Sequence, residues 1–347
     1  MTSASPFIIP VFIAHQGCPH QCIFCNQHVI TRDSGQSSRV GAQEVKKEIE
    51  TCLSWPRDRT RDVQVAFYGG SFTGLNRSLQ EELLQAVQPY MNDGLVQSVR
   101  LSTRPDYIDS ETACFLKEHN VGLVELGVQS MDPNVLAMAG RGHGSDQAQK
   151  AFCVLKEAGI AVGGQLMIGL PGESTAGVLD GARQLAALKP DLVRIYPTLV
   201  IQGSPLARMF ARKEYQPMSL NKAIALCSKL KRYFDDQKIP VIRMGLQPSA
   251  SLEKDVVAGP YHPAFGELVM SRLFFRRMRD ILRKRQDTGK DSSLTITLAN
   301  SDRSQFQGMK KCSLKRLESL HLLDGVQIVY SADQARGTIA VCEEVSC

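Results

Sequence analysis

Short apolar runs alternate with amphipathic runs between residue 7 and about residue 200, and this alternation constrains the fold more than any other feature. The strand-like runs are Phe7–Ala14, Val63–Tyr68, Val99–Ser102, Leu123–Val128, Ala161–Ile168 and Leu192–Tyr196. The helix-like runs are Ala42–Leu53, Ser78–Met91, Ser110–His119, Gln147–Ala158 and Thr175–Leu188. Consecutive β/α units pair their strands in parallel through right-handed crossovers. We therefore expect α/β architecture, namely a partial parallel (β/α)6 barrel, while periodicity leaves a flat doubly wound sheet open as the alternative.

Several of these strands are almost continuously apolar, which is typical of a parallel sheet covered by helices. The alternation stops after Tyr196. We expect an amphipathic helix over Leu220–Phe234, a short strand near Val241, and a long helix from about Ala264 to Arg285. Further strand-like runs are Leu294–Leu298, Val326–Tyr330 and Thr338–Cys342. The expected domains are a core barrel over residues 1–244 and a smaller C-terminal α+β domain over residues 245–347.

Three cysteines follow the first strand-like run in one tight loop, at the spacing CxxxCxxC. They are Cys18, Cys22 and Cys25. Three thiolates can bind three irons of a cubane [4Fe-4S] cluster and leave the fourth iron open. An open coordination position permits chemistry, whereas a fully ligated metal is structural. The alternative is a zinc site whose fourth ligand is His15, His20 or His28.

The other cysteines and the N-terminus favour a reducing compartment. The chain has ten cysteines, but its length and the absence of a signal-peptide pattern at Met1–Pro6 argue against a secreted disulfide framework. The apolar run that begins at Phe7 is too short to cross a bilayer. We therefore expect a cytoplasmic protein without membrane contact. Cys312, Cys342 and Cys347 share no compact ligand motif, which disfavours a second cluster.

Glycine and amide side chains accompany the ends of other strand-like runs. Gly69 and Gly70 follow the second run, and paired glycines let a ligand approach the backbone closely. Gln129 follows the fourth run, and Gln165 lies in the fifth, which ends in Gly-Leu-Pro-Gly. Because the C-terminal ends of barrel strands meet at one mouth, we expect both glutamines near the cysteines. We interpret Glu173, after that turn, as a helix-capping carboxylate.

Together these motifs resemble the radical S-adenosylmethionine (SAM) superfamily. The resemblance covers about residues 7–245 and rests on CxxxCxxC, Gly-Gly and Gly-Leu-Pro-Gly in that order, which disfavours the zinc alternative. In that superfamily the open iron binds SAM, and one electron cleaves SAM to methionine and a 5′-deoxyadenosyl radical. The resemblance implies a [4Fe-4S] cluster and SAM as cofactors, and a reductant such as flavodoxin or ferredoxin as a partner.

The resemblance also implies roles for individual residues. Cys18, Cys22 and Cys25 are the implied cluster ligands. The implied SAM-binding residues are Phe24, Gly69, Gly70, Ser102, Gln129, Arg141 and Gln165. Arg141 matches the position at which oxygen-independent coproporphyrinogen oxidases have an arginine to the SAM carboxylate. No side chain that acts on the substrate can be assigned.

Two serines depart from the superfamily pattern. Ser71 stands where the common Gly-Gly-Glu motif has glutamate, and Ser102 stands where relatives often carry a ribose-binding glutamate. A serine hydroxyl accepts a hydrogen bond from a ribose hydroxyl more weakly than a carboxylate does. The implied role of Ser102 is therefore the least supported of the set.

Longer segments resemble the radical SAM part of the Elongator catalytic subunit and its bacterial relatives. These segments are Gly69–Thr73, Thr103–Tyr107 and Arg194–Ser204. Elongator proteins modify the wobble uridine of tRNA with the help of an acetyltransferase domain, for which we expect no room in this chain. The resemblance implies RNA or tRNA modification, and small-molecule or tetrapyrrole-like chemistry is the alternative. A protein that binds a cluster, SAM or haem without turnover is a third hypothesis.

A basic stripe on the expected long helix bears on the RNA hypothesis. Its members recur at spacings of four, three and four residues and are Arg272, Arg276, Arg279 and Arg283. Arg277, Lys284 and Arg285 are expected to add to it. With a net charge of +6, the chain is compatible with an anionic substrate. The stripe suits phosphate contacts, and a solvated helix face is the alternative. The sequence does not indicate an oligomeric state.

Overall fold

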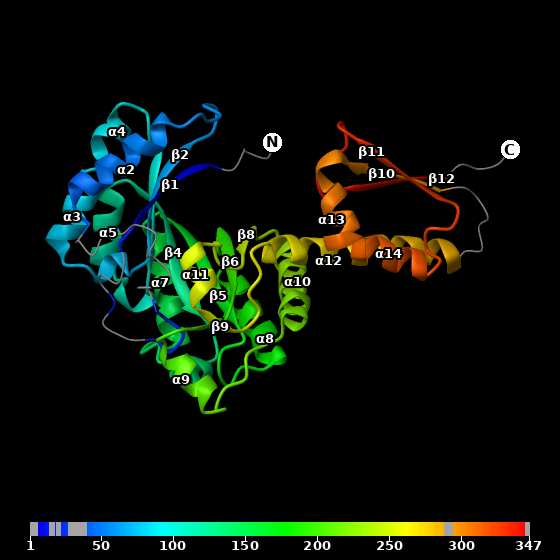
Figure 1. Cartoon of the computed structure of the whole chain (residues 1–347). Coiled ribbons are helices and arrows are strands. Elements are labelled where there is room, and N and C mark those ends of the chain that lie inside the picture. Colours follow the sequence, from blue (N-terminus) through cyan, green and yellow to red (C-terminus); the bar gives the residue numbers. More distant parts are fainter. Residues whose placement is uncertain (1–5, 14–17, 19–21, 27–39, 288–293, 344–347) are drawn as a thin grey trace. The chain divides into compact units, whose positions relative to one another are not determined.

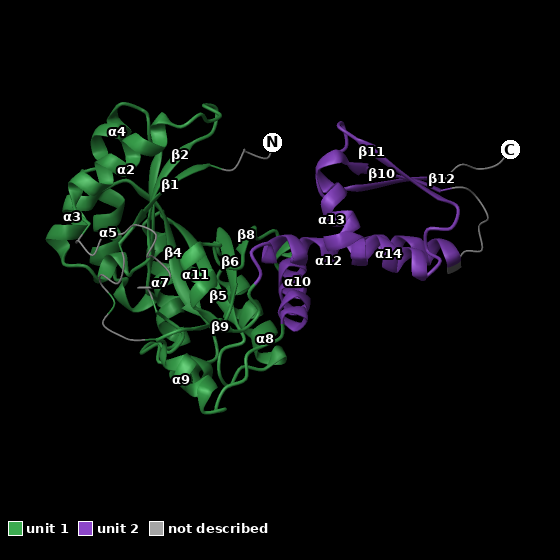
Figure 2. Ribbon diagram, viewed as in Figure 1, with its two compact units in different colours: residues 1–219, 234–261 green, residues 220–233, 262–347 purple. Residues whose placement is uncertain are grey.

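The computed structural model describes residues 6–13, 18, 22–26, 40–287 and 294–343. The chain divides into two compact units, residues 1–219 with 234–261 and residues 220–233 with 262–347 (Figure 2). The helix α10 (Leu220–Asp236) contributes to both units. The domain division at residue 245 stays a prediction, since a compact unit need not be a folding domain. Within the described ranges, no helix has the length and apolar character needed to cross a membrane.

The first unit is built on a parallel sheet that curls into a half-barrel (Figure 1). Its strands are ordered β1-β2-β3-β4-β5-β6-β8. They are β1 (Phe7–Phe12), β2 (Val63–Tyr68), β3 (Ser98–Thr103), β4 (Val121–Gln129), β5 (Ala161–Ile168), β6 (Leu192–Pro197) and β8 (Val241–Met244). The predicted partial barrel is confirmed, and the strand expected near Val241 joins it as a seventh strand. A separate two-stranded sheet pairs β7 (Val200–Ile201) with β9 (Val256–Ala258).

Helices follow most strands of this sheet. They are α2 (Ala42–Ser54), α3 (Arg77–Gln85), α4 (Gln88–Asn92), α5 (Ser110–Glu118), α6 (Pro133–Met138), α7 (Ser145–Glu157), α8 (Thr175–Ala187), α9 (Pro205–Ala211) and α11 (Ala250–Asp255). The single helix expected over Ser78–Met91 is wrong, because the chain breaks into α3 and α4 there. Pro89 lies in the first turn of α4, where a proline is tolerated, and it could not continue a helix from α3.

The two faces of the half-barrel sheet differ in polarity. Alternate residues of a strand point to opposite faces. The outer face is buried and apolar, with Val65, Leu101 and Val124 in adjacent strands, and α5 and α7 contact β4 on it. The inner face instead carries Arg100 and Glu125, although both residues are buried. The inner face is therefore polar in places, although several strands read as almost continuously apolar runs.

One buried carboxylate organises this inner face. Glu125 Oε1 accepts hydrogen bonds from Arg100 Nη2 at 2.5 Å and from Arg194 Nη2 at 3.0 Å. The Tyr68 hydroxyl donates to the same oxygen at 3.0 Å. Burial, with a contribution from Glu125, raises the pKa of Tyr68 to about 12, so its hydroxyl keeps the donated proton. These four residues belong to β4, β3, β6 and β2, so a single charge cluster joins four strands.

The turn after β5 is held by Glu173. Its Oε2 accepts hydrogen bonds from the backbone N–H of Gly169 at 2.5 Å and of Leu170 at 3.3 Å. The helix α8 is capped by Ser174, whose side chain accepts a hydrogen bond from the Gly177 N–H. The interpretation of Glu173 as the helix cap is therefore wrong. Its carboxylate braces the preceding turn, because the chain folds back there before the helix begins.

The second unit is the smaller α+β part that the sequence predicts. The strand β10 (Leu294–Ala299) lies between β11 (Val326–Ser331), which is parallel to it, and β12 (Ile339–Glu343), which is antiparallel. Its helices are α12 (Phe265–Asp287), α13 (Arg303–Gln307) and α14 (Cys312–Ser319). The core packs one side of α12 against the sheet and contains Phe274, Met278, Leu282, Leu294, Ile296, Leu298, Phe306, Leu317 and Leu322.

Glu125→Gln should destabilise the protein by about 3 kcal/mol, because the buried Arg100 and the half-buried Arg194 lose their shared counter-charge. Urea unfolding followed by circular dichroism measures this change. Glu111→Gln is the control, since the Glu111 side chain is 87% exposed in its ion pair with Arg77. Such exposed pairs contribute less than about 1 kcal/mol. Equal losses in the two variants would show that the buried cluster does not stabilise the sheet.

Burial raises the pKa of Glu173 to about 7, against two backbone hydrogen bonds that lower it. The folded protein therefore holds this proton more tightly than the unfolded chain does. Its contribution to stability is fully present below about pH 4.5 and is lost as the pH rises through about 7. Glu173→Gln keeps an oxygen acceptor without the charge. This variant should match the parent protein near pH 4.5 and be more stable at pH 8 by about 3 kcal/mol.

Urea unfolding at the two pH values tests the role of Glu173. Glu157→Gln, at an exposed position of α7, is the control and should leave the pH dependence of stability unchanged. A Glu173→Gln variant whose stability falls between pH 4.5 and 8 as steeply as that of the parent protein would refute this assignment.

Candidate functional site

The segments that the sequence singles out meet at the C-terminal edge of the half-barrel sheet. Gly69 and Gly70 follow β2, Gln129 is the last residue of β4, and Gln165 lies in the second half of β5. The strand β1 runs parallel to β2 and leads into the cysteine loop at this edge. Parallel strands bring their carboxyl ends together, so the fold collects residues that are far apart in sequence.

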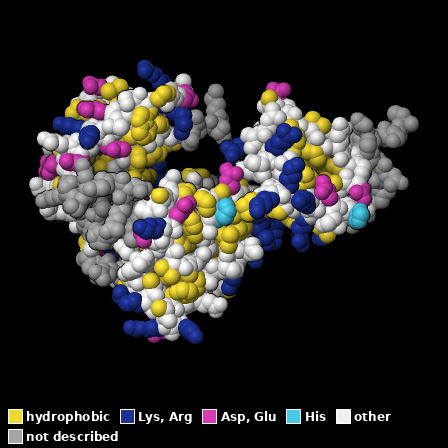
Figure 3. Space-filling model, in the orientation of Figure 1, with side chains coloured by type: hydrophobic (Ala, Val, Ile, Leu, Met, Phe, Trp, Pro, Cys, Tyr) yellow, Lys and Arg dark blue, Asp and Glu magenta, His cyan; other side chains and the backbone are white. Residues whose placement is uncertain are grey.

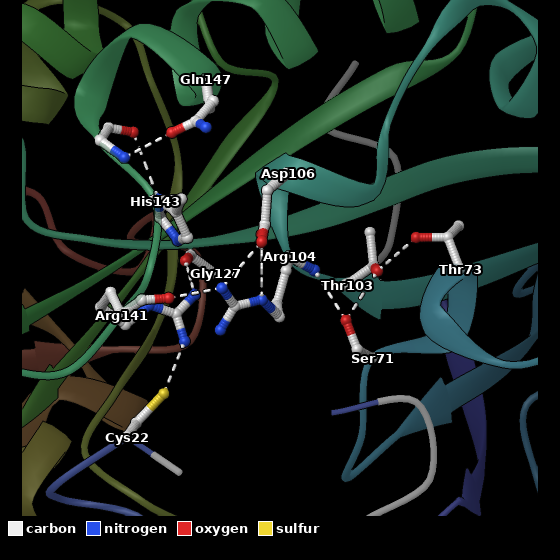
Figure 4. A network of polar contacts seen from close by, with 11 residues as sticks. Cys22, Ser71, Thr73, Thr103, Arg104, Asp106, Gly127, Arg141, His143 and Gln147 are labelled. Atoms are coloured by element: carbon white, nitrogen blue, oxygen red, sulfur yellow. Dashed lines mark hydrogen bonds and ion pairs between the residues drawn. The ribbon is translucent and has the colours of Figure 1, made fainter. Parts of the chain in front are cut away.

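Arg141 connects the cysteine loop to the end of β4. Its Nη1 donates to Cys22 Sγ over 3.2 Å, and its Nη2 donates to the Gly127 carbonyl oxygen over 2.6 Å (Figure 4). The residue is buried, and its Nε has no hydrogen-bond partner among the described residues. A buried N–H group without a partner carries a desolvation cost. This donor is therefore available to an anionic group bound at the same edge.

A second buried arginine holds Arg141 in place. Arg104 Nε donates to Asp106 Oδ1 at 2.9 Å, and Arg104 Nη2 donates to Asp106 Oδ2 at 2.8 Å. The same Nη2 donates to the carbonyl oxygen of Arg141. Pro105 begins the short helix η3 (Pro105–Tyr107), whose turn lets the side chains of its two neighbours meet. The bidentate ion pair fixes the guanidinium group of Arg104, and this group in turn fixes the backbone at Arg141.

The two arginines face the cysteine sulfur atoms. Burial, followed by the neighbouring Cys22, raises the pKa of the Cys18 thiol. Arg104, Arg141 and a backbone hydrogen bond from Ser71 act in the opposite direction. Positive charge beside a cysteine favours the thiolate, which is the form that binds a metal. The two arginines therefore partly offset the effect of burial on the Cys18 thiol.

The structure covers the predicted metal ligands only in part. Cys18, Cys22 and Cys25 are described, but residues 19–21 between them are not. Within the described ranges, no three His, Cys, Asp or Glu side chains are grouped as ligands for one metal ion. The alternative ligands His15, His20 and His28, and Cys347 of the disfavoured second site, lie outside the described residues. The assignment of the metal ligands stays a prediction.

The second half of the cysteine loop packs against the mouth of the half-barrel. The Ile23 N–H donates to the Ala139 carbonyl at 3.1 Å, and the Leu206 N–H donates to the Ile23 carbonyl at 2.8 Å. Phe24 contacts two apolar clusters, one of which contains Met167 at the end of β5. The ring of Phe24 therefore lies at the same edge as the other candidate residues. Its predicted contact with the adenine of SAM stays a prediction.

Gln129 has a strained backbone and contacts Gln165. Its φ angle is 66°, in the left-handed region that side chains other than glycine rarely occupy. A break in register between Gly127 and Gln129 marks a bulge at this end of β4. Gln165 Nε2 donates to Gln129 Oε1 at 3.0 Å, so the structure brings the two predicted glutamines together. Strained residues of this kind concentrate at functional sites.

Hydroxyl groups join the ends of β2 and β3. Ser71 Oγ lies 3.1 Å from Thr103 Oγ1, and Thr73 Oγ1 lies 2.6 Å from the same atom. The Arg104 N–H also donates to Ser71 Oγ at 3.2 Å. Ser71, the residue that departs from Gly-Gly-Glu, is buried and bonded within the protein. Its role in the structure is to tie one strand end to the next.

The remaining candidates lie at or just below the same edge. Gly69 has a φ angle of 85°, which only glycine adopts without strain. Gly70 follows it and is half-buried. Ser102 is half-buried in β3 and aligns in register with Glu125 of β4. The binding roles predicted for these three residues stay predictions.

Three residues at the site have no role that the sequence motifs specify. No role was expected for Arg104, Asp106 or His143. Burial, followed by Arg141, lowers the pKa of His143 to about 4, so its ring is neutral at pH 7. Two features of the sequence could have indicated such residues. One is the Arg-Pro-Asp segment directly after a strand, and the other is a single charged residue, such as Glu125, inside an otherwise apolar strand.

Comparison with known proteins finds relatives in sequence and in fold. Residues 12–184 match the radical SAM superfamily, and residues 190–274 match the radical SAM C-terminal domain. An uncharacterised protein of Methanocaldococcus jannaschii is 30% identical over 230 residues, which cover 63% of this chain and 69% of that protein. A tRNA uridine(34) acetyltransferase of the same organism is 28% identical over 261 residues, which cover 65% of this chain and 48% of that protein.

Solved structures extend the comparison to the fold. The Elp3 protein of the archaeon Methanocaldococcus infernus, with an N-terminal deletion, aligns with a TM-score of 0.60 and 22% identity over 81% of this chain and 64% of that chain. At this identity the likeness concerns the fold alone. The chain spans about half the length of the tRNA uridine acetyltransferases that it matches. Together, the two family matches and the shared half-barrel establish that the chain belongs to the radical SAM superfamily of enzymes.

Proposed function

We propose that Cys18, Cys22 and Cys25 bind a [4Fe-4S] cluster and that the adjacent strand ends bind SAM for radical chemistry. Members of the superfamily use these two cofactors. The observation that carries the proposal is the position of Arg141. This guanidinium group contacts Cys22 Sγ and the Gly127 carbonyl, so it joins the cysteine loop to the end of β4. The expected cluster and the expected SAM site would therefore be neighbours.

The residues present fit both groups. Three thiolates leave one iron of a cubane cluster open for another ligand. Arg104 and Arg141 act on Cys18 in the direction that favours such thiolates. The buried Nε of Arg141 offers an unused donor that suits the carboxylate of SAM.

A bound cluster would supply the electron for cleavage of SAM to methionine and a 5′-deoxyadenosyl radical, which is the species that abstracts a substrate hydrogen. The chain's own residues bind and orient. Arg141 would hold the SAM carboxylate through Nε, while its other nitrogens keep their present partners. Gln129 and Gln165, already bonded to each other at 3.0 Å, would offer amide groups to the ribose hydroxyls. Phe24 and Met167 would exclude water on the apolar side.

For the substrate we propose a nucleoside within tRNA. The support is the similarity to proteins named tRNA uridine(34) acetyltransferase, although their acetyl transfer is not part of the proposal because the chain spans about half their length. The polar inner face agrees with this class of substrate. Tyr68, Glu125 and Arg194 make that face polar, whereas an apolar macrocycle would favour a hydrophobic lining. A cytoplasmic flavodoxin or ferredoxin would supply the electron.

Anaerobic reconstitution with iron and sulfide should load about four irons and four sulfides per chain. Cys18→Ala, Cys22→Ala and Cys25→Ala should each abolish loading, because each removes one of the three thiolates. Cys153→Ala, at an exposed position on α7, is the matched control and should load normally. Iron and sulfide analysis together with visible absorption provides the readout. Stoichiometric zinc without any cluster after reconstitution would refute the proposal.

The reduced, cluster-loaded protein should cleave SAM slowly to 5′-deoxyadenosine without a substrate. Arg141→Gln should weaken SAM binding roughly tenfold or more, because a charge-assisted hydrogen bond to the carboxylate is lost. Equilibrium dialysis measures binding, and chromatography measures 5′-deoxyadenosine at equal cluster content. Arg183→Gln, whose parent side chain is 64% exposed, should bind SAM normally. Tight SAM binding with no 5′-deoxyadenosine under strong reductant would indicate a binding protein without turnover.

A further inference from the structure

The long helix α12 has an apolar side and a basic side. Phe274, Met278 and Leu282 are buried in the core of the second unit. The helical repeat of 100° per residue places Arg272, Arg276, Arg279 and Arg283 together on a different side. Arg272 and Arg283 are exposed, and Arg276 and Arg279 are half-buried. The basic side of α12 is therefore accessible along its length.

A second helix adds to this basic side. Burial lowers the pKa of Arg272, and Arg276, Arg279 and Arg316 lower it further because their positive charges lie close by. Arg316 is exposed on α14. Because it belongs to another helix, the spacing of arginines along α12 could not predict that it lies near the stripe. We call these five residues the arginine face: Arg272, Arg276, Arg279, Arg283 and Arg316.

Two other arginines of α12 do not belong to this face. Arg277 Nη1 donates to the Gly337 carbonyl at 2.6 Å, and Arg285 Nη1 donates to the Asp324 carbonyl at 3.0 Å. The expectation that they add to the stripe is therefore wrong. They hold the loops beside the three-stranded sheet, because those loops pack against their side of the helix.

The arginine face is weakly neutralised by the protein itself. Arg279 forms an ion pair with Asp280 at 2.7 Å. Within the described part of the chain, the other four arginines make no ion pair. Residues 262–347 contain 14 lysines and arginines against 10 aspartates and glutamates, so they carry +4 of the chain's +6. Figure 3 shows Lys and Arg side chains spread over this unit.

We propose that the arginine face binds the phosphate backbone of a folded RNA. From Arg272 to Arg283 the helix advances about 16 Å, a length that spans several phosphates of a nucleic acid strand. Arginine matches phosphate with paired N–H donors. Single-stranded RNA is a poorer match, because it is bound through exposed aromatic rings, and Phe274 on this helix is buried. The inference rests on the proposed tRNA substrate and adds the surface that holds it.

Fluorescence anisotropy with labelled tRNA tests the proposal on the full chain. The variant replaces four arginines by glutamine, which keeps helix propensity, at Arg272, Arg276, Arg283 and Arg316. Affinity should fall roughly tenfold or more at 0.1 M salt, and the slope of log affinity against log salt should flatten by about 3. Two double variants, Arg272→Gln with Arg276→Gln and Arg283→Gln with Arg316→Gln, should each show about half of the change in slope.

The matched control removes four exposed positive charges from the first unit: Lys46→Gln, Lys47→Gln, Lys150→Gln and Arg183→Gln. It should keep tRNA affinity within about twofold. An equal loss of tRNA affinity in this control would show that affinity depends only on net charge, and it would overturn the proposal. Equal affinity of the parent protein for unstructured poly(U) and for tRNA would overturn the preference for folded RNA.

The readouts separate this inference from the proposed function. The four-arginine variant should still cleave SAM to 5′-deoxyadenosine without RNA, because all of its changes lie in the second unit and the strand ends belong to the first. A parent protein that cleaves SAM but has no tRNA affinity at low salt would overturn the arginine face and leave the radical chemistry standing. A parent protein that binds tRNA with the predicted salt slope but never cleaves SAM would overturn the radical chemistry and leave the arginine face standing.

Discussion

A single carboxylate inside the half-barrel fixes the strands on which the candidate site stands. Glu125 is shared by Arg100, Arg194 and Tyr68, which come from three other strands. Charges of this kind persist inside a protein only where each has its partners, because every unpaired group is costly. The cluster lies two residues below Gly127, whose carbonyl receives Arg141. The spacing of the strands at the charge cluster therefore sets the spacing of the groups at the edge.

At that edge, buried arginines with fixed partners also connect the strand ends to the cysteine loop. Asp106 fixes Arg104, Arg104 fixes the backbone at Arg141, and Arg141 reaches Cys22, which is 119 residues away in sequence. Each step joins groups that are already buried or partly buried, so each contact restricts the next. The site is thus assembled by tertiary contacts, and the motifs mark the segments that those contacts bring together.

The strands and the residues at their ends could be predicted because they depend on local patterns. The bounds of β2 and β5 agree with the apolar runs in the sequence. The inner face could not be predicted, because single charged residues such as Glu125 find their partners only after the strands are aligned. The same reason explains Glu173 and Arg277. A helix position or a helical wheel does not show which turn or loop will lie beside a side chain.

The outermost strands of the half-barrel sheet, β1 and β8, are not joined to each other in the part of the chain that the structure describes. A closed barrel admits only what can pass along its axis. An open side admits one unit of a long polymer while the rest of the polymer stays in solvent. In an open sheet, the size of the group that can enter is therefore limited by the side chains along the open edge. In a closed barrel, it is limited by the diameter of the pore. Phe12, the last residue of the outermost strand β1, is 48% exposed.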